Sequence, residues 1–294
     1  MSKTIYIAGS INTDLAIRAP YMPQKGETLK GSGFFTAHGG KGANQAVAAA
    51  RLGGTVRMCG CVGADLFGEQ ALSSLRREGI DVTHIRTAEG VPSGTAVIVV
   101  VDGDNRILLD SGANACLCEQ DIDAFLAEAE AGDIFLTQLE NPVDVVGYGL
   151  KRAKEKGMYV ILNPAPADRG IEKYFPYCDL VVPNETEYAI LDEDGALSSR
   201  FGGDLIVTLG EKGFSCMSAG KTRTVPCRKV DVVDTTAAGD TFCGGLAVLC
   251  AEGAELVRAA KFGSAAASLA CTRQGAQPSV PVRSGVLEFM KEER

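Results

Sequence analysis

Short apolar runs alternate with amphipathic segments along most of the chain. The apolar runs predict buried strands at 4–8, 56–62, 82–86, 134–139, 158–162, 180–182 and 205–209. Apolar residues at helical spacing predict helices near 39–52, 67–79, 122–129, 141–157, 239–251, 255–271 and 285–291. The helix at 141–157 is expected to start with Asn141 as its cap and Pro142 in its first turn. This alternation predicts a mainly parallel sheet with helices on both faces.

Two segments do not fit that pattern. Residues 13–36 alternate at first and are then broken by Pro20, Pro23 and several glycines. Within 94–110 a β-branched run is followed by Asp102-Gly103 and a second apolar stretch, which is typical of a hairpin. We expect a small accessory sheet that forms a lid. Because no repeat or linker divides the chain, a single domain over 1–294 is predicted.

Polar residues follow the predicted strands. In parallel sheets ligands bind beyond the carboxyl ends of the strands, so these residues are candidates for a site. Each one alone is better explained as a turn or cap residue, and it is their number that favours a site. They are Asn12, Asp14, Glu140, Asn163, Asn184, Glu187 and Gly210.

A glycine-rich stretch covers residues 38–45, with the sequence His-Gly-Gly-Lys-Gly-Ala-Asn-Gln. It is not a Walker A loop, because Lys41 is not followed by Ser or Thr, and no GxGxxG follows a strand. Two interpretations stay open. The stretch is either a plain tight turn or a loop whose backbone approaches a small polar ligand.

A second stretch, 232–245, passes from an apolar run through small residues into a helix. Ala237, Ala238 and Gly239 have almost no side chain, so their N–H groups at a helix start favour an anion. Asp240 follows at once. It is either a helix cap or a general base for a nucleophile that attacks a phosphate.

Asn184 and Glu187 have the spacing of a capping box. The alternative is that Glu187 holds Mg²⁺ through water, since Mg²⁺ prefers carboxylate and water oxygens beside phosphates. The two histidines, His38 and His84, match no nucleophile motif such as GxSxG and are interpreted as non-catalytic.

Composition narrows the classes of function. The chain has 294 residues, 46% of them hydrophobic, a net charge of −8 and no Lys/Arg-rich block, so nucleic acid and anionic membranes are not expected partners. The ten cysteines include no CxxC pair, which favours reduced thiols over zinc or disulfides. No apolar run approaches the roughly 18 residues of a membrane span, and the N-terminal run is too short for a signal peptide. A cytoplasmic protein is predicted.

The glycine-rich stretch and Asp234-Thr-Thr-Ala-Ala-Gly-Asp-Thr-Phe resemble the two signatures of the ribokinase-like sugar kinase family. Further motifs resemble the family in the same order, so the resemblance covers nearly the whole chain. They are Gly9-Ser-Ile-Asn-Thr-Asp14, Gln138-Leu-Glu140, Asn163-Pro-Ala-Pro-Ala, Pro183-Asn-Glu-Thr-Glu187, Thr208-Leu-Gly and the stretch 272–281. The implied fold is a three-layer α/β sandwich with a central, mainly parallel sheet and a small β-sheet lid.

The resemblance implies a role for each matching residue. Asp240 is the implied base, and Ala237, Ala238 and Gly239 form the implied anion hole. The implied sugar ligands are Asn12, Asp14, Gly40, Lys41, Asn44, Glu140 and Asp240. ATP is implied to lie against Asn184, Thr208, Gly210, Gly213 and Gly239, with Ser264 near the adenine. Glu187 is implied to order Mg²⁺ through water, and an implied K⁺ site combines Asp234, Thr236, Ala270, Arg273, Gly275 and Ser279.

The implied activity is transfer of a phosphoryl group from ATP to O5 of D-ribose, in a homodimer joined through the lid. The alternatives are a kinase for deoxyribose, fructose or a nucleoside, or a sugar-binding regulator without activity. Two departures stand out. The segment between Leu191 and Asp204 is too short for the family's usual helix, and Ser264 replaces a larger polar residue.

Overall fold

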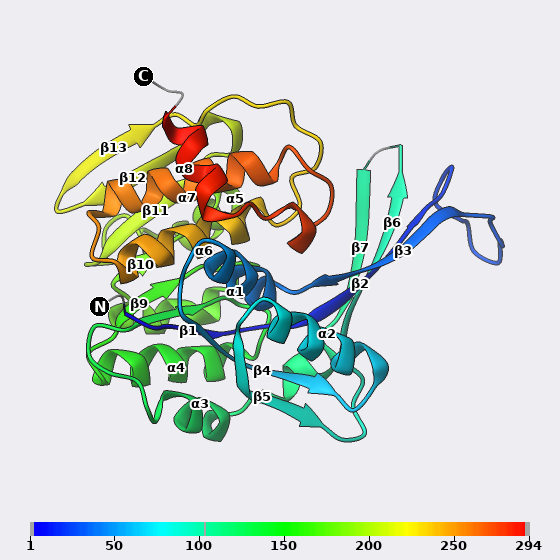
Figure 1. Cartoon of the computed structure of the whole chain (residues 1–294), viewed down its shortest axis with the longest axis horizontal. Helices are drawn as coiled ribbons and strands as arrows, with labels where there is room; N and C mark the ends of the chain where they lie inside the picture. The colour runs from blue at the N-terminus through cyan, green and yellow to red at the C-terminus, as the bar shows by residue number, and fades with distance from the viewer. Residues whose placement is uncertain (1–2, 103, 292–294) are drawn as a thin grey trace.

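The computed structural model describes residues 3–102 and 104–291, so Gly103 of the predicted hairpin turn lies outside the described residues. In this part of the chain, nine strands form the central sheet in the order β13-β12-β11-β10-β9-β8-β1-β4-β5 (Figure 1). The seven strands β11, β10, β9, β8, β1, β4 and β5 run parallel, and β12 pairs antiparallel with both β11 and β13. Their bounds are β1 (Ile5–Ala8), β4 (Val56–Gly63), β5 (Asp81–Ala88), β8 (Ile134–Thr137), β9 (Tyr159–Leu162), β10 (Leu180–Val181), β11 (Asp204–Thr208), β12 (Phe214–Ser218) and β13 (Lys221–Val225).

Helices cover both faces of this sheet, as the alternating pattern predicts. One hydrophobic cluster packs the sheet against α1 (Lys41–Arg51), α2 (Leu66–Arg77), α6 (Ala238–Ala251), α7 (Leu256–Ala270) and α8 (Arg283–Lys291). A second cluster on the other face includes α3 (Glu119–Leu126), α4 (Val143–Glu155), α5 (Glu185–Leu191), η1 (Gly112–Cys116) and η2 (Arg169–Tyr177). The three-layer α/β architecture is confirmed.

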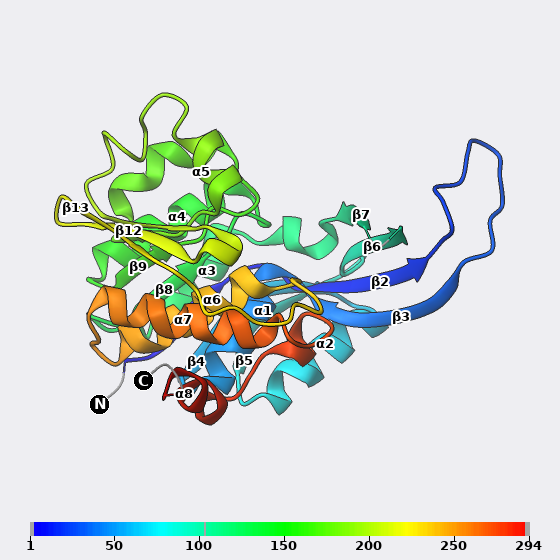
Figure 2. The same cartoon turned by 90° about the horizontal axis from the view of Figure 1, so that it is seen from above.

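A separate four-stranded sheet projects from one end of the body (Figure 2). Its order is β3 (Ser32–Gly39), β2 (Asn12–Arg18), β6 (Gly94–Val101) and β7 (Asp104–Asp110). These strands come from the two segments that break the strand–helix rhythm. Only three residues separate the end of β1 from the start of β2, so the chain passes directly from the central sheet into the small one.

Helix α6 is buried on nearly all sides because it lies between the sheet, α1 and α7. Gly244 makes the contact with α1 close. A Cβ atom at this position would lie 2.6 Å from the Cβ of Ala48 and 2.9 Å from the carbonyl oxygen of Gln45. A side chain here would push the two helices apart, so the glycine sets the distance between them.

The structure adds one element and corrects two local expectations. The hairpin β12–β13 was not predicted from the sequence. Asn141 does not cap α4, because the cap position is Pro142 and the Asn141 amide instead donates to the carbonyl oxygen of Asn114 at 3.0 Å. The predicted strand at 134–139 ends at Thr137, which leaves Gln138 and Glu140 beyond the sheet.

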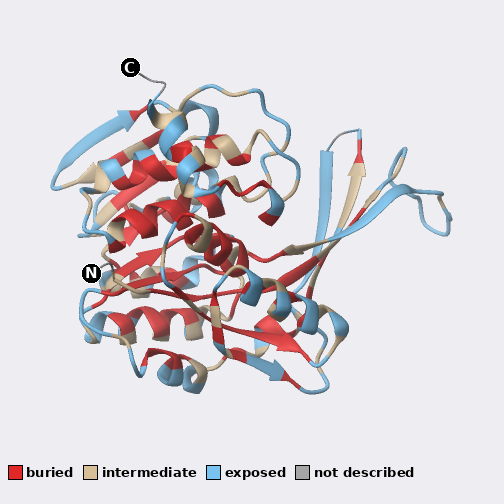
Figure 3. Cartoon of the chain, viewed as in Figure 1, coloured by how far each residue is buried: buried red, intermediate tan, exposed pale blue. Residues whose placement is uncertain are grey.

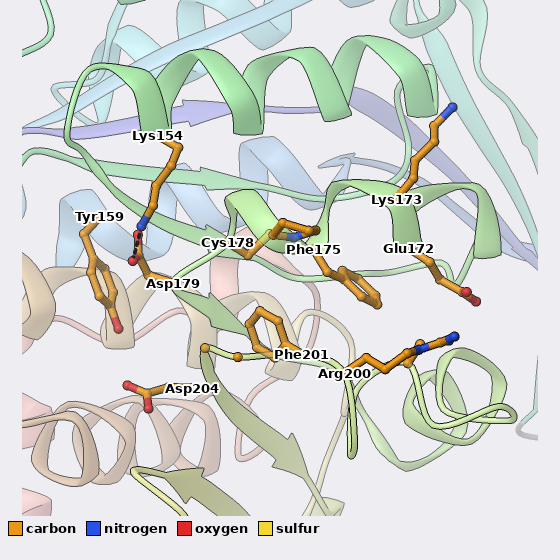
Figure 4. Close-up of a pocket in the computed structure, with 14 residues that line it drawn as sticks. Lys154, Tyr159, Glu172, Lys173, Phe175, Cys178, Asp179, Arg200, Phe201 and Asp204 are labelled. Atoms are coloured by element: carbon orange, nitrogen blue, oxygen red, sulfur yellow. Dashed lines mark hydrogen bonds and ion pairs between the residues drawn. The ribbon is translucent and has the colours of Figure 1, made fainter.

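The shortened segment after α5 forms turns, with no helix in residues 192–203. Beside it lies a cavity of about 890 Å³, shown in Figure 4. Tyr159 and Asp204 begin β9 and β11, so this cavity is at the amino ends of the strands. It is therefore on the opposite edge of the sheet from the predicted site. Its charged groups are largely paired, as with Lys154 and Asp179 at 2.5 Å.

All ten cysteines are unpaired thiols. Burial raises the pKa of the Cys61 and Cys250 thiols to about 12, so both stay protonated at neutral pH. Among the helices of residues 3–102 and 104–291, none combines the length and the apolar character that crossing a membrane requires.

Candidate active site

The predicted sugar and base residues converge at the carboxyl ends of β1 and β8 and at the starts of α1 and α6. Two glycines bring α1 against the residues after β1. Gly40 has a φ of 87°, and a Cβ atom there would lie 2.7 Å from the Asn12 nitrogen. A Cβ atom at Gly42 would lie 2.5 Å from the Gly9 carbonyl carbon. The backbone of the glycine-rich stretch therefore lies directly against the backbone that follows β1, and a larger residue at either glycine would disrupt this contact.

Asp240 lies in the first turn of α6 and is only 7% exposed. It does not cap the helix, because the cap position is Ala237, which has a left-handed φ of 58°. Its Oδ2 accepts from Asn44 Nδ2 and its Oδ1 from Gln45 Nε2, both at 3.0 Å. Burial raises the pKa of Asp240, against the opposing effects of Lys41 and these two amides.

Lys41 places a positive charge among three carboxylates. Burial lowers the pKa of its ammonium group, but Asp240, Glu140 and Glu187 outweigh that effect and raise it overall. The backbone N–H of Lys41 donates to Glu140 Oε2 at 3.1 Å, and the Ser10 hydroxyl donates to the same oxygen at 2.6 Å. The start of α1 is thereby fixed to the end of β8, with a charged lysine beside Asp240.

Asp14 points from β2 towards this group of charges. Burial, followed by repulsion from Glu140, raises the pKa of Asp14 to about 6. Asn12, at the start of the same strand, accepts from Asn114 Nδ2 with its amide oxygen at 2.7 Å, and its amide NH₂ group is available to a ligand. Two carboxylates and amide groups at one place suit a ligand that carries several hydroxyls.

The three small residues before Asp240 differ in their hydrogen bonding. The Ala238 N–H donates to the carbonyl oxygen of Thr235 at 3.2 Å. Within the described residues, the N–H groups of Ala237 and Gly239 have no acceptor. A Cβ atom at Gly239 would meet nothing within 4 Å, so space is open on that side. This is the geometry of an anion site at a helix start.

The residues predicted to line the nucleotide follow β10 and β11. Asn184 and Glu187 form the capping box of α5, with bonds of 2.8 and 2.9 Å. Burial raises the pKa of Glu187, and the charges of Lys41 and Asp240 also act on it, so the cap residue is near the site as well. Asn184 also pairs with Thr208 in a parallel bridge.

Gly210 and Gly213 flank a tight turn after β11, with φ values of 56° and 98°. Ser264 on α7 lines a second cavity of about 190 Å³, whose wall is formed by Val225, Phe289 and Met290 among others. The lining of this cavity includes neither Asp240 nor any of the residues predicted to bind the sugar. The structure therefore brings Ser264 together with α8 and β13 rather than with Asp14 or Asn44.

The residues predicted to hold K⁺ belong to two loops that are joined. Asp234 Oδ1 accepts from the Thr236 N–H and hydroxyl at 2.9 and 2.6 Å, and its Oδ2 accepts from the Gly275 N–H at 2.9 Å. The carbonyl oxygen of Ala270 accepts from the Arg273 N–H, and the Ser279 hydroxyl donates to Ala276. In the described chain, no group of three or more His, Cys, Asp or Glu side chains is arranged to bind a metal.

Several site residues were missed by the sequence reasoning. They are buried polar side chains that contact other residues of the site, namely Ser10, Gln45, Asn114, Gln138 and Gln277. Ser10 and Gln138 follow strands and Gln45 adjoins Asn44, which was the available signal, whereas nothing local marked Asn114 and Gln277. Asn163, one of the strand-end candidates, contacts Gln45.

The chain belongs to the pfkB family of carbohydrate kinases, whose model matches residues 2–283. It is therefore a phosphotransferase with an alcohol group as acceptor. It is 41% identical to the ribokinase of Haemophilus influenzae over 99% of both chains, and 36% identical to the deoxyribokinase of Salmonella typhimurium over 94% of this chain and 95% of that one. Its fold matches the structure of Arabidopsis thaliana ribokinase complexed with ribose and ATP, with a TM-score of 0.87, 30% identity and 99% of both chains covered.

Proposed function

We propose that this kinase transfers the γ-phosphoryl group of ATP to O5 of D-ribose. The observation that carries the proposal is the buried Asp240, held by Asn44 and placed beside Lys41 at the start of α6. A base at a helix start, next to N–H groups without acceptors, fits attack by a hydroxyl on a phosphate. The similarity to ribokinases over almost the whole chain supports ribose as the acceptor.

The residues have separate tasks in this mechanism. Asp14, Glu140 and Asn44 hold the sugar hydroxyls, with Asn12, Gly40 and Lys41 around them. Asp240 takes the proton of the primary hydroxyl as O5 attacks the phosphorus in line. The N–H groups of the Ala237–Gly239 turn then stabilise the charge on the phosphoryl oxygens. Asn184, Thr208, Gly210 and Gly213 hold the nucleotide on the other side of Asp240.

The proposal includes two metal ions, Mg²⁺ beside the phosphates and K⁺ behind the anion turn, and each would be held by different residues. Glu187 would hold Mg²⁺ through water, since Mg²⁺ prefers carboxylate and water oxygens beside phosphates. Asp234, Thr236 and carbonyl oxygens of the 270–279 loop offer the all-oxygen surroundings that K⁺ requires. When bound, Mg²⁺ neutralises phosphate charge and K⁺ supports the shape of the anion turn. Asp234 already ties the two loops together through Gly275.

A comparison of acceptors tests the proposed reaction. We expect the highest kcat/KM for ribose, by at least about tenfold over deoxyribose, fructose and adenosine, because a missing or moved hydroxyl leaves a polar group of the site unpaired. ADP release is measured for each sugar with ATP and Mg²⁺, in buffers with and without K⁺. A higher kcat/KM for deoxyribose would support the alternative that the Salmonella typhimurium relative suggests. Ribose binding without ADP release would mean a sugar-binding regulator.

The lid sheet carries the apolar surface that supports a dimer. Strand β7 is exposed along its whole length, and Ile107, Leu108 and Phe34 are 58, 74 and 64% exposed (Figure 3). An exposed apolar edge strand favours pairing with another chain. We therefore place the dimer interface at the lids of two copies.

Changing Leu108 to Lys is expected to convert a dimer into monomers of 30.8 kDa, because a charge would then be buried between the lids. Light scattering after size exclusion measures the mass. The matched control is Leu287→Lys on α8, which is 43% exposed and outside the lid. A wild-type monomer, or a Leu108→Lys dimer, would place the interface elsewhere or remove it.

The ten unpaired thiols support a reducing compartment, and we propose the cytoplasm. Labelling of thiols in intact and lysed cells tests this location. Labelling by a membrane-impermeant reagent before lysis would argue against it.

A further inference from the structure

Gln45 is a fully buried side chain of α1 with every hydrogen-bonding group used. Its Nε2 donates to Asp240 Oδ1 and to Asn163 Oδ1, each at 3.0 Å. Its Oε1 accepts from Gln138 Nε2 at 2.6 Å. With no exposed surface, it has no access to a sugar in the site, so its effect on the reaction must pass through Asp240.

The orientation of the Gln45 amide follows from a main-chain group. Asn163 Nδ2 donates to the carbonyl oxygen of Val182 at 2.8 Å, and a carbonyl oxygen accepts only. Asn163 must therefore turn its Oδ1 towards Gln45, and Gln45 must present its NH₂ group to that oxygen. The second hydrogen of the same NH₂ group is then available to Asp240.

We propose that Gln45 is a positioning residue, which holds the Asp240 carboxylate in one fixed orientation through an amide chain anchored at the Val182 carbonyl. The chain runs from the main chain after β10 through Asn163 to α1 and then to α6. Asn44 fixes the other carboxylate oxygen from the ligand side. The proposal rests on the proposed function, since it takes Asp240 as the base.

The charges around Asp240 make this contact important. Burial raises the pKa of Asp240, and Glu140 raises it further, while Lys41, Asn44 and Gln45 lower it. Glu187 of α5 and the Cys243 thiol of α6 also face this group. An amide donor favours the ionised form, so Gln45 helps to keep Asp240 able to accept a proton.

Replacing Gln45 by Met keeps the volume and removes the donor. We expect kcat to fall about tenfold and the KM for ribose to change less than about threefold, because Gln45 does not touch the sugar. The acid limb of the pH profile of kcat/KM should move to higher pH by about one unit, since Asp240 loses a donor to its charged form. Gln45→Glu, which preserves shape, should move the limb further through repulsion.

Asn163→Ala tests the anchor without changing Gln45. The Gln45 amide is then free to turn its oxygen to Asp240, so the acid limb should move in the same direction. The control is Asp133→Asn, which disturbs a buried carboxylate with bonds to the Thr4 and Glu130 N–H groups at the far end of β8. Asp133→Asn is expected to lower the melting temperature, because one of these N–H groups loses its acceptor, and to leave the acid limb in place.

The two proposals fail in different ways. An acid limb that stays within about 0.2 pH units in all three test variants, with kcat within about twofold, overturns the role of Gln45 while the enzyme remains a ribose kinase. A rise in KM at unchanged kcat would move Gln45 to sugar binding and also overturn it. If the unchanged protein releases no ADP with any sugar, the proposed function itself is wrong. A variant that loses folded protein is measured per folded molecule, so the limb stays readable.

Discussion

Replacing Asp240 by Asn is expected to lower kcat by at least about 10²-fold, and up to about 10⁴-fold, because a positioned base contributes that much to proton transfer. The amide has nearly the same shape, and Asn44 and Gln45 supply donors to both oxygens of the wild-type group. The KM for ribose should change much less than kcat, since the change acts on the reacting hydroxyl. Steady-state ADP release at saturating ATP and Mg²⁺ measures both constants.

The melting temperature of the Asp240→Asn variant separates a chemical role of the carboxylate from a structural one. Because burial raises the pKa of Asp240, its charged form costs stability, which the neutral amide relieves. The NH₂ group of the new amide faces a donor from Asn44 or Gln45, which offsets that gain, so the melting temperature should change little. A folded Asp240→Asn enzyme with near-normal turnover would show that another group takes the proton. Loss of activity together with loss of folding would instead point to a structural role for the carboxylate.

Replacing Asp14 by Asn is expected to raise the KM for ribose about 10- to 100-fold at pH 7.5, because a charged acceptor that holds sugar hydroxyls is lost. The pKa of about 6 adds a pH dependence. In the wild type, protonation below about pH 6 removes the same acceptor, so kcat/KM should fall there. The KM of Asp14→Asn should show no such change near pH 6. Titration of the initial rate with ribose between pH 5 and 8 measures both effects.

Although Asp14→Asn should weaken ribose binding, it should make the folded protein more stable. The folded-state pKa of Asp14 lies above its ordinary value of 3.8, so the folded protein binds the proton more tightly than the unfolded chain does. The Asp14 contribution therefore destabilises the fold above about pH 6 and is relieved as the pH falls towards 4. At pH 7.5 Asp14→Asn should raise the free energy of unfolding by on the order of 1 kcal/mol. A drop in stability with unchanged KM would remove Asp14 from the site.

The sequence allowed the parallel sheet, both helix layers and the small sheet to be predicted, because their apolar residues follow the period of each element. Strand β13 escaped prediction because its residues are exposed up to Val225, so it shows no buried face. Asn141 was misassigned because its side chain reaches Asn114, a contact between distant segments. Local spacing carries no information about such contacts.

In the candidate site too, the residues in local motifs could be predicted, and those that act through contacts between distant segments could not. Asp14, Lys41, Asn44, Glu140 and Asp240 stand in recognisable motifs, and the structure brings them together. Gln45 stands in the glycine-rich stretch, but its importance depends on Gln138 and Asn163, which follow β8 and β9, and on Asp240 of α6, which meet only in the folded chain. The interpretation of Asp240 as a helix cap was wrong, since the left-handed Ala237 places the cap three residues earlier.

The close contact at Gly244 has a consequence for how sugar preference can change during evolution. Asn44 and Asp240 sit on two helices that pack closely at this glycine, whereas Asp14 and Asn12 sit on a strand of the projecting sheet. Movement or substitution in the sheet alters the sugar contacts and leaves the distance between the amide and the base unchanged. A family built this way can acquire new acceptors by changing one part of the molecule, without rebuilding the part that performs the chemistry.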